Sequence, residues 1–264
     1  MKKSMSKGNK VLFIILGIIL ALVLFVAVVI IVNAPTNVKA MNSAIDTAIE
    51  TIKIEYTVTE VDCGDYSTMS VYGIMKFDVK QYDVEGVGNL SVMTMNMGVM
   101  QMATVVLTPV YRDIPLISMD YMYILGNRKC YLEFYDLILD KEGDYKELIS
   151  DLEAVKTKYD NLDDVTPTAA WYDALKTVGI YKSGTKANDI EFNNILVDGI
   201  GTVLSYSKTL PELTGDDRAE KINLQKSYSD GLIENGGVST DAFVKSLGAE
   251  TTKDFFDKVL FKAE

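Results

Sequence analysis

The sequence contains no histidine and only 2 cysteines among its 264 residues. A chain without histidine has no Ser-His-Asp or Cys-His nucleophile and no His-ligated zinc, copper or haem. Cys63 and Cys130 are too few for a four-cysteine metal site or a disulfide scaffold. Any proton transfer must therefore use Asp, Glu, Lys, Tyr or Cys side chains.

Basic residues are also scarce, because 26 Lys and Arg stand against 37 Asp and Glu, a net charge of −11. A nucleic-acid partner is not expected, since phosphate binding needs a basic face. The acidic clusters at 140–144, 160–164 and 216–217 do not match the calcium-binding loop pattern. They are typical of helix caps and solvated surface, so no metal site is expected.

One long apolar run, residues 11–32, lies near the N-terminus. As a helix it spans about 30 Å, the thickness of the hydrocarbon core of a bilayer. Four lysines precede it, at positions 2, 3, 7 and 10. The positive-inside rule therefore predicts a single-pass cell-membrane protein with a cytoplasmic basic tail, residues 1–10, and everything after the run outside. The alternative is a signal peptide cut after Ala40, but the apolar region of a signal peptide is usually about 7–15 residues long.

Residues 33–40 are expected to be a polar linker, and residues 41–264 a single domain. The part beyond the anchor carries 22 basic and 37 acidic residues, a net charge of −15, which favours solubility and repels anionic lipid. In an oxidising compartment, Cys63 and Cys130 either pair or remain small buried hydrophobic residues.

The spacing of apolar residues changes along this domain. A helix is expected at 41–53, with Ile45, Ala48, Ile49 and Ile52 on one face. Alternation between glycine-containing turns predicts an antiparallel meander of about six strands, at 54–61, 71–77, 90–95, 99–107, 117–124 and 130–134. Further helices are expected at 145–159, 168–178, 187–207, 216–234 and 239–261. Strands followed by helices indicate an α+β domain, with one sheet covered by helices.

Several short segments follow one another in an order that is informative. They are Val105-Val-Leu-Thr-Pro109, Ile114-Pro-Leu-Ile-Ser-Met-Asp120, Phe134-Tyr-Asp-Leu137, Trp171, Gly179-Ile-Tyr-Lys-Ser183, Phe243-Val-Lys-Ser-Leu-Gly248 and Val259-Leu-Phe261. In order and spacing they resemble the ferredoxin-dependent bilin reductases, of the phycocyanobilin:ferredoxin oxidoreductase type. The resemblance covers about residues 55–264.

This resemblance implies an α/β/α sandwich with a central antiparallel sheet. It implies a linear tetrapyrrole (a bilin) bound between the sheet and the C-terminal helices. The family uses no flavin, metal or nicotinamide cofactor; ferredoxin donates single electrons to the bilin, and protein side chains supply the protons. Since a shared fold does not transfer function, each site residue is weighed separately.

Asp120 matches the family's catalytic aspartate, which faces the bilin from a strand. A carboxyl group in an apolar pocket has a raised pKa and can donate a proton to a reduced tetrapyrrole. The alternative is an aspartate that accepts backbone hydrogen bonds at a strand end. The neighbouring Tyr121 is a candidate for stacking on the ligand, although tyrosine is also ordinary in strands.

Other positions depart from the family pattern. Thr104 stands where the family has a catalytic histidine, and a hydroxyl group cannot shuttle protons near neutral pH as imidazole does. Val92 or Met93 stands where the family has a glutamate. Lys182 replaces an arginine that meets a propionate group, and Asn235 is the best polar candidate before the last helix.

Methionines alternate on two adjoining predicted strands, as Met93 and Met95 on the first and Met100 and Met102 on the second. A two-residue turn would place Met93 opposite Met102, with Thr104 on the same face, whereas a three-residue turn would split the methionines between faces. The methionines either form an adaptable wall for a large flat apolar ligand or pack against a helix. A Cu(I) site has no other support in the chain.

Three functions fit these observations: a membrane-tethered bilin reductase, a binding module for a bilin or another flat apolar molecule, and a non-catalytic structural or interaction ectodomain with a filled pocket. The missing histidine and glutamate favour binding, as does a location away from cytoplasmic ferredoxin. The sequence therefore predicts a membrane-anchored, extracytoplasmic bilin-reductase-like domain that binds a linear tetrapyrrole or similar ligand. Reduction would use Asp120 as the proton donor, and the electron donor is left open.

Overall fold

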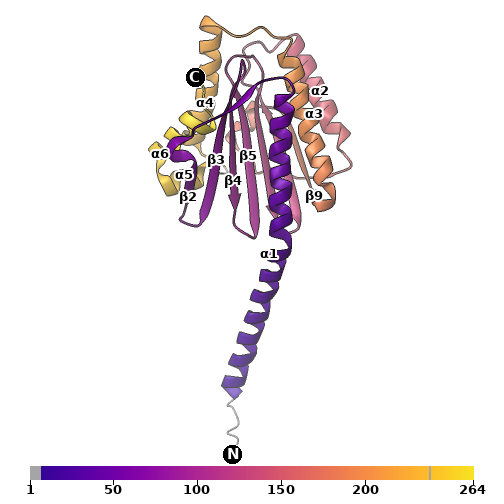
Figure 1. Ribbon diagram of the computed structural model, residues 1–264, viewed down its shortest axis with the longest axis vertical. Coiled ribbons are helices and arrows are strands. Elements are labelled where there is room, and N and C mark those ends of the chain that lie inside the picture. Colours follow the sequence, from indigo (N-terminus) through magenta and orange to yellow (C-terminus); the bar gives the residue numbers. More distant parts are fainter. Residues whose placement is uncertain (1–6, 238) are drawn as a thin grey trace, which may run out of the picture.

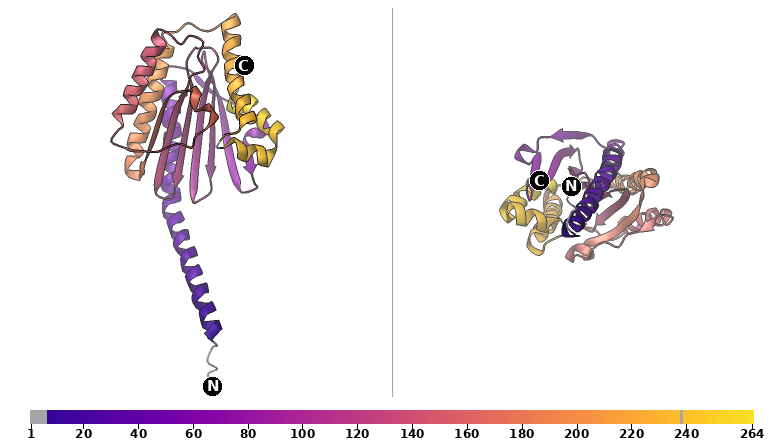
Figure 2. Two further views of the ribbon diagram at one scale, coloured as in Figure 1. Left: turned by 180° about the vertical axis from the view of Figure 1, so that it is seen from behind. Right: turned by 90° about the horizontal axis from the view of Figure 1, so that it is seen from below.

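A single antiparallel sheet forms the middle layer of the computed structural model, which describes residues 7–237 and 239–264. Nine strands take part, in the order β1-β3-β4-β5-β6-β7-β9-β8, with β2 beside β3. Helices cover both faces of the sheet, so the molecule has three layers (Figures 1 and 2). This arrangement confirms the predicted α+β sandwich, with more strands than the six expected.

Most of the strands lie where alternation predicts them. Their bounds are β1 Val58–Val61, β2 Thr68–Val71, β3 Met75–Val84, β4 Gly88–Asn96, β5 Met100–Pro109, β6 Leu116–Ile124, β7 Asn127–Tyr135, β8 Asp163–Asp164 and β9 Lys176–Thr185. The strand expected at 71–77 is interrupted at residues 72–74 by the turn between β2 and β3, because Tyr72 and Gly73 both have positive φ angles, of 53° and 70°. Residues 54–57, expected to be strand, precede β1 as a turn.

The helices divide between the two faces of the sheet. Helices α1 (Lys7–Lys53), α2 (Asp144–Lys158) and α3 (Asp189–Ser207) cover one face. Helices α4 (Gly215–Asn235), α5 (Thr240–Leu247) and α6 (Ala249–Phe255), with a π-helical turn at 256–260, cover the other.

Two helix predictions are wrong. The helix expected at 168–178 is a 3-10 turn, Trp171–Leu175, followed by β9, in which Val178 and Ile180 are buried and alternate with half-buried neighbours. The helix expected at 239–261 is interrupted at Gly248, whose φ of 90° is incompatible with a right-handed helix.

Helix α1 is continuous over 47 residues, from the apolar run into the domain. The polar linker expected at 33–40 is therefore helical, and the helix expected at 41–53 is its last part. Pro35 removes one backbone donor, and two neighbouring side chains bond to the backbone there. Asn33 Nδ2 donates to the carbonyl oxygen of Val29, and Thr36 Oγ1 donates to that of Asn33, each at 2.8 Å.

The two halves of α1 have different surroundings. An 18-residue window in the first half has a mean hydropathy of 3.6 and no buried residue, so this helix is long and apolar enough to cross a membrane. In the second half, Ala44, Ala48 and Ile52 are buried against the sheet, as their spacing predicts. Residues 1–6, most of the expected basic tail, lie outside the described residues.

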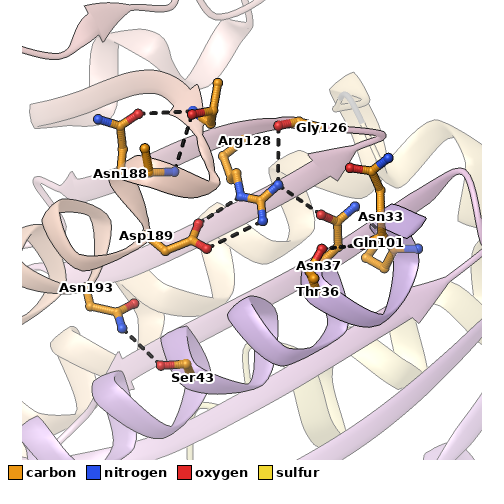
Figure 3. Close-up of polar contacts among 12 residues, drawn as sticks. Asn33, Thr36, Asn37, Ser43, Gln101, Gly126, Arg128, Asn188, Asp189 and Asn193 are labelled. Atoms are coloured by element: carbon orange, nitrogen blue, oxygen red, sulfur yellow. Dashed lines mark hydrogen bonds and ion pairs between the residues drawn. The ribbon is translucent and has the colours of Figure 1, made fainter. Parts of the chain in front are cut away.

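A buried polar cluster joins α1 to the sheet where the apolar run ends (Figure 3). Arg128 on β7 lies 2.8 Å from Asp189 at the start of α3, and its Nη1 donates to Asn37 Oδ1 at 2.9 Å. Asn37 Nδ2 donates in turn to Gln101 Oε1 and to the carbonyl oxygen of Leu125, both at 2.8 Å. Arg128 and Asn37 are almost fully buried. We call the set of Arg128, Asp189, Asn37 and Gln101 the polar junction. It fixes α1 to β5, β7 and α3.

A second buried charge holds α4 on the opposite face. The Lys221 ammonium group is fully buried and donates to Asp113 Oδ1 at 3.1 Å, to the carbonyl oxygen of Ile114 at 2.8 Å and to that of Leu137. All three of its hydrogens therefore have acceptors. Burial lowers the pKa of Lys221 to about 8, although the nearby Asp113 carboxylate raises it.

The two cysteines do not pair. Cys130 is buried on the α1–α3 face and Cys63 is half-buried on the other face, so both are free thiols.

We expect Arg128→Ala to lower the free energy of unfolding by about 2–3 kcal/mol, because Asn37 and Asp189 lose a buried charged partner. The measurement is denaturant unfolding of the full chain in micelles. Lys80→Ala is the control, since the Lys80–Glu60 pair is exposed on both sides, and we expect a change below about 0.5 kcal/mol there. Equal small effects for both variants would contradict a stabilising polar junction.

Candidate functional site

Four side chains of adjacent strands form a row across the middle of the sheet. Met93 on β4 pairs with Thr104 on β5, Thr104 with Asp120 on β6, and Asp120 with Tyr131 on β7. Directly paired residues of antiparallel strands point to the same face. The row therefore lies on the face that α4 to α6 cover.

A cavity of about 350 Å³ lies over this row. Its floor is formed by the sheet, through Met93, Met102, Thr104, Val106, Ser118, Asp120, Met122, Lys129, Tyr131, Glu133 and Tyr135. The segment before β9, the helix α4 and the C-terminal segment close it, through Thr166–Thr168, Tyr172, Lys176, Tyr228, Leu232, Gly237, Ser239, Thr240, Phe243, Phe256, Leu260 and Phe261. The volume falls within the range of about 300–1,000 Å³ that is typical of small-molecule sites.

Asp120 is the acid at the floor of the cavity. Thr104 Oγ1 donates a hydrogen bond to Asp120 Oδ1 at 2.5 Å. Burial raises the pKa of Asp120 to about 6; the Thr104 hydrogen bond opposes this rise, the Glu133 charge adds to it and the Lys176 charge opposes it. A carboxyl group with this pKa holds a proton at mildly acid pH and releases it near neutrality, which suits a proton donor.

A second carboxylate, Glu133 on β7, lies on the same face of the sheet as Asp120. Its Oε1 is 2.7 Å from Lys176 Nζ, and its Oε2 accepts a hydrogen bond from the Tyr135 hydroxyl group at 2.6 Å. Lys176 also lies 2.8 Å from Asp173. Burial lowers the pKa of Lys176, but its hydrogen bonds to Asp173 and Glu133 outweigh burial and raise the pKa overall. Lys176 therefore stays charged beside Asp120.

Aromatic rings form the wall opposite the strands. The Tyr228 ring lies 4.9 Å from that of Tyr135 and 5.6 Å from that of Phe261. Burial raises the pKa of both tyrosines well above its usual range, so both phenols remain protonated. Gly231 allows Trp171 to pack on α4, because a Cβ at Gly231 would lie 2.5 Å from the indole ring. The cavity thus has a polar centre in an aromatic and methionine surround.

The structure brings together four of the seven residues predicted for the site, since Asp120, Thr104, Met93 and Met102 all line the cavity. Val92, the other position considered for the family glutamate, points to the opposite face.

The other three predicted residues lie elsewhere. Tyr121 follows Asp120 in the strand, so it points to the α1–α3 face, where its hydroxyl group donates to the carbonyl oxygen of Phe192 at 2.8 Å. Lys182 is buried and pairs with Asp164 at 2.7 Å. Asn235 is exposed at the end of α4 and donates to the carbonyl oxygen of Gly231. We do not carry these three into the proposed site.

The methionine hairpin has a two-residue turn, but its register differs from the expected one. Met95 lies opposite Met102 and Met93 lies opposite Thr104, because the turn residues are Gly98 and Val99. The shift equals two residues on one strand, which preserves the face of every side chain. The expectation that Met93, Met102 and Thr104 share a face is therefore confirmed.

Glu133, Lys176 and Tyr228 also line the cavity and are not among the residues predicted from the sequence. Glu133 alternates with Tyr131 and Tyr135, so its face follows from the strand pattern once Asp120 is placed. Lys176 was not identified because residues 168–178 were predicted to be a helix, whereas Lys176 begins β9. No sequence pattern indicates the contact of Tyr228 with Tyr135.

A larger groove, of about 780 Å³, runs between α2 and α3. Asp144, Glu147, Asp151 and Asp198 line it, and it has no aromatic or methionine wall comparable to that of the cavity. We therefore take the cavity over Asp120 as the candidate site.

Comparison with known proteins supports the fold. No protein-family model and no curated protein matches the chain. Among solved structures, the crystal structure of phytochromobilin synthase from tomato in complex with biliverdin is similar, with a TM-score of 0.69. The match covers 84% of this chain and 83% of that chain at 14% sequence identity. Such low identity shows a bilin-reductase-like fold and no more.

We expect the Asp120 carboxyl group to titrate near pH 6, and Thr104→Val to raise its pKa further, because the variant loses a hydrogen bond to the ionised form. Infrared spectroscopy of the carboxylic C=O band follows the titration, with Asp120→Asn to assign it. Loss of the band near pH 4, the ordinary range of aspartate, would contradict the desolvated environment.

The same shift has a consequence for stability. Because the folded-state pKa of Asp120 lies above the ordinary value for aspartate, 3.8, the contribution of Asp120 to stability falls as the pH rises from about 4 to about 6. Asp120→Asn removes this fall, so we expect the variant to gain up to about 3 kcal/mol relative to the unchanged chain between pH 4 and pH 7.

Proposed function

We propose that this chain binds a linear tetrapyrrole, or a similarly flat apolar molecule, in the cavity over Asp120. The observation that carries the proposal is a carboxyl group with a pKa of about 6 at the floor of an aromatic- and methionine-lined cavity. The fold around it is similar to that of a protein crystallised with biliverdin.

The chemistry of the cavity suits such a ligand. A conjugated, nearly flat molecule packs on aromatic rings and on adaptable methionine side chains, and both line the cavity. A bilin also carries propionate groups that need a cation. Lys129 lines the cavity and has no ion-pair partner among the described residues, so it is free to meet a carboxylate.

Asp120 is the proton donor in this proposal if the bound pigment is reduced. Each two-electron reduction of a bilin takes up two protons, and the electrons must come from an external one-electron donor. Thr104 fixes the Asp120 carboxyl group through its short hydrogen bond. The Glu133–Lys176 pair supplies a second ionisable site beside it, on the β7 side of Asp120, whereas the position of the family glutamate is on β4.

The alternative is a structural or interaction ectodomain with a filled pocket. The open volume of about 350 Å³ argues against it, since protein cores leave few voids larger than a water molecule.

We propose that the ligand-binding domain lies on the extracytoplasmic side of the membrane. Residues 11–32 would be the anchor, residues 1–10 a cytoplasmic tail, and residues 41–264 the ligand-binding domain. The apolar first half of α1 and the lysines before the apolar run support this topology.

We expect the full chain in micelles to shift the absorption spectrum of biliverdin. Ser118→Phe should weaken binding at least about tenfold, because the new ring would occupy the cavity floor. Ser70→Phe is the matched control, since Ser70 is exposed on β2 and lies outside the cavity, and a thermal melt verifies the fold of both. An unshifted spectrum with the unchanged chain would leave the structural alternative.

With a strong one-electron reductant, we expect slow conversion of the bound biliverdin. Asp120→Asn should reduce the rate by about 10²–10⁴-fold with little loss of affinity, the effect typical of a lost general acid. Single-turnover absorption spectroscopy measures the rate. Equal rates in the variant and the unchanged chain would remove Asp120 from the reaction and leave ligand binding alone.

A further inference from the structure

Exposed apolar side chains gather at one end of the domain. Six of the ten large apolar side chains that are exposed outside α1, counted over the described residues, belong to this set: Tyr72, Ile74, Val99, Ile124, Leu125 and Ile190. We call them the apolar collar. Scattered exposed apolar residues need no explanation, but a gathering at one end marks an interaction surface.

The strand register places the collar at one end. The turns β2–β3, β4–β5 and β6–β7 all lie at the same end of the sheet. Thr185, which precedes α3, pairs with Asn127 beside the β6–β7 turn. Figure 1 shows these turns side by side above the free part of α1. The three turns contain no Asp, Glu, Lys or Arg, whereas turns at the opposite end contain Glu85, Arg112 and Asp113.

Helix α1 leaves the domain through the collar. A Cβ at Gly98 would lie 3.4 Å from Ile30, and a Cβ at Gly126 would lie 3.6 Å from Asn33 Oδ1. The turns therefore reach the last residues of the apolar run, which ends at Val32. Ile30 lies about 3 Å before this end along the helix axis, on the N-terminal side. From below, the N-terminal part of α1 projects beneath the middle of the domain (Figure 2).

The polar junction prevents the domain from swinging away from this position. Arg128, Asn37 and Asp189 hold α1 to the β6–β7 turn and to the start of α3 (Figure 3). Ile190 follows Asp189 directly, so the collar and the helix have one fixed relative orientation.

We propose that the apolar collar is seated in the headgroup–acyl boundary of the lipid leaflet that α1 crosses; this rests on the proposed membrane anchor. The attraction is hydrophobic rather than electrostatic, because the three turns are uncharged and the part beyond the anchor carries a net charge of −15, which anionic headgroups repel. The lipid surface is the occupant, since the apolar run and the collar are continuous along α1.

The test measures the depth of spin labels in the full chain, reconstituted in phosphatidylcholine vesicles. Cys63→Ser removes the accessible thiol, and Cys130 is fully buried. Nitroxide labels are placed through Ile74→Cys and Ile190→Cys, whose side chains are 70% and 73% exposed. Ile54→Cys is the matched control, being 74% exposed at the opposite end of the domain, and Leu20→Cys reports on the anchor.

We expect the labels at 74 and 190 to collide with oxygen more and with a water-soluble nickel chelate less than the label at 54. Their ratios should correspond to a depth of about 5–10 Å in the boundary region. Labels at 74 and 190 that resemble the label at 54, with the label at 20 deep in the bilayer, would overturn the seated collar and leave the anchor. A water-exposed label at 20 would overturn both. Exclusion of both reagents at 74 or 190 would indicate protein contact and also overturn it. Biliverdin binding by the same samples reports separately on the cavity.

Discussion

The desolvation of one carboxyl group is the constraint on which the candidate site depends. Asp120 lies on β6, between Thr104 of β5 and Tyr131 of β7. The neighbouring strands and the α4–α6 layer keep water from most of its surface. A charged carboxylate is costly there, so the group retains its proton to about pH 6. Thr104 limits the shift by one hydrogen bond, and the Glu133–Lys176 pair keeps the surroundings polar without neutralising Asp120.

The two faces of the sheet have different tasks. The α1–α3 face is a packed apolar core with the polar junction at its edge, and it fixes the domain to the helix that carries the apolar run. The α4–α6 face retains a cavity, and Lys221 holds the first half of α4 to the loops beside the sheet. The attachment to α1 and the proposed binding site are therefore on opposite faces of the sheet. Met122, which lines the cavity, is only two residues from Ile124 of the collar, about 7 Å along the strand.

Local patterns account for what the sequence predicted well. Alternation identified β4 to β7 and thereby placed Asp120, Thr104, Met93 and Met102 on one face, even though the hairpin register was off by two residues. Long-range contacts account for what it missed. The local pattern of residues 168–178 predicts a helix, but residues 176–178 belong to β9. The pairing of β9 with β7 brings Lys176 to Glu133. Just beyond Pro35, Asn37 of the continuous helix α1 is hydrogen-bonded to residues 64 and 91 positions away, which no local pattern predicts. Tyr121 was assigned to the wrong face because adjacent residues of a strand point in opposite directions.

The most direct test of the central claim is the proton count of biliverdin binding. Isothermal titration calorimetry of the full chain near pH 6, in two buffers of different ionisation enthalpy, measures the protons taken up or released. If Asp120 faces the ligand, binding should change its pKa, so the unchanged chain should show a net proton exchange that Asp120→Asn abolishes. Binding with no proton exchange, or with the same exchange in the variant, would contradict a site built around this carboxyl group.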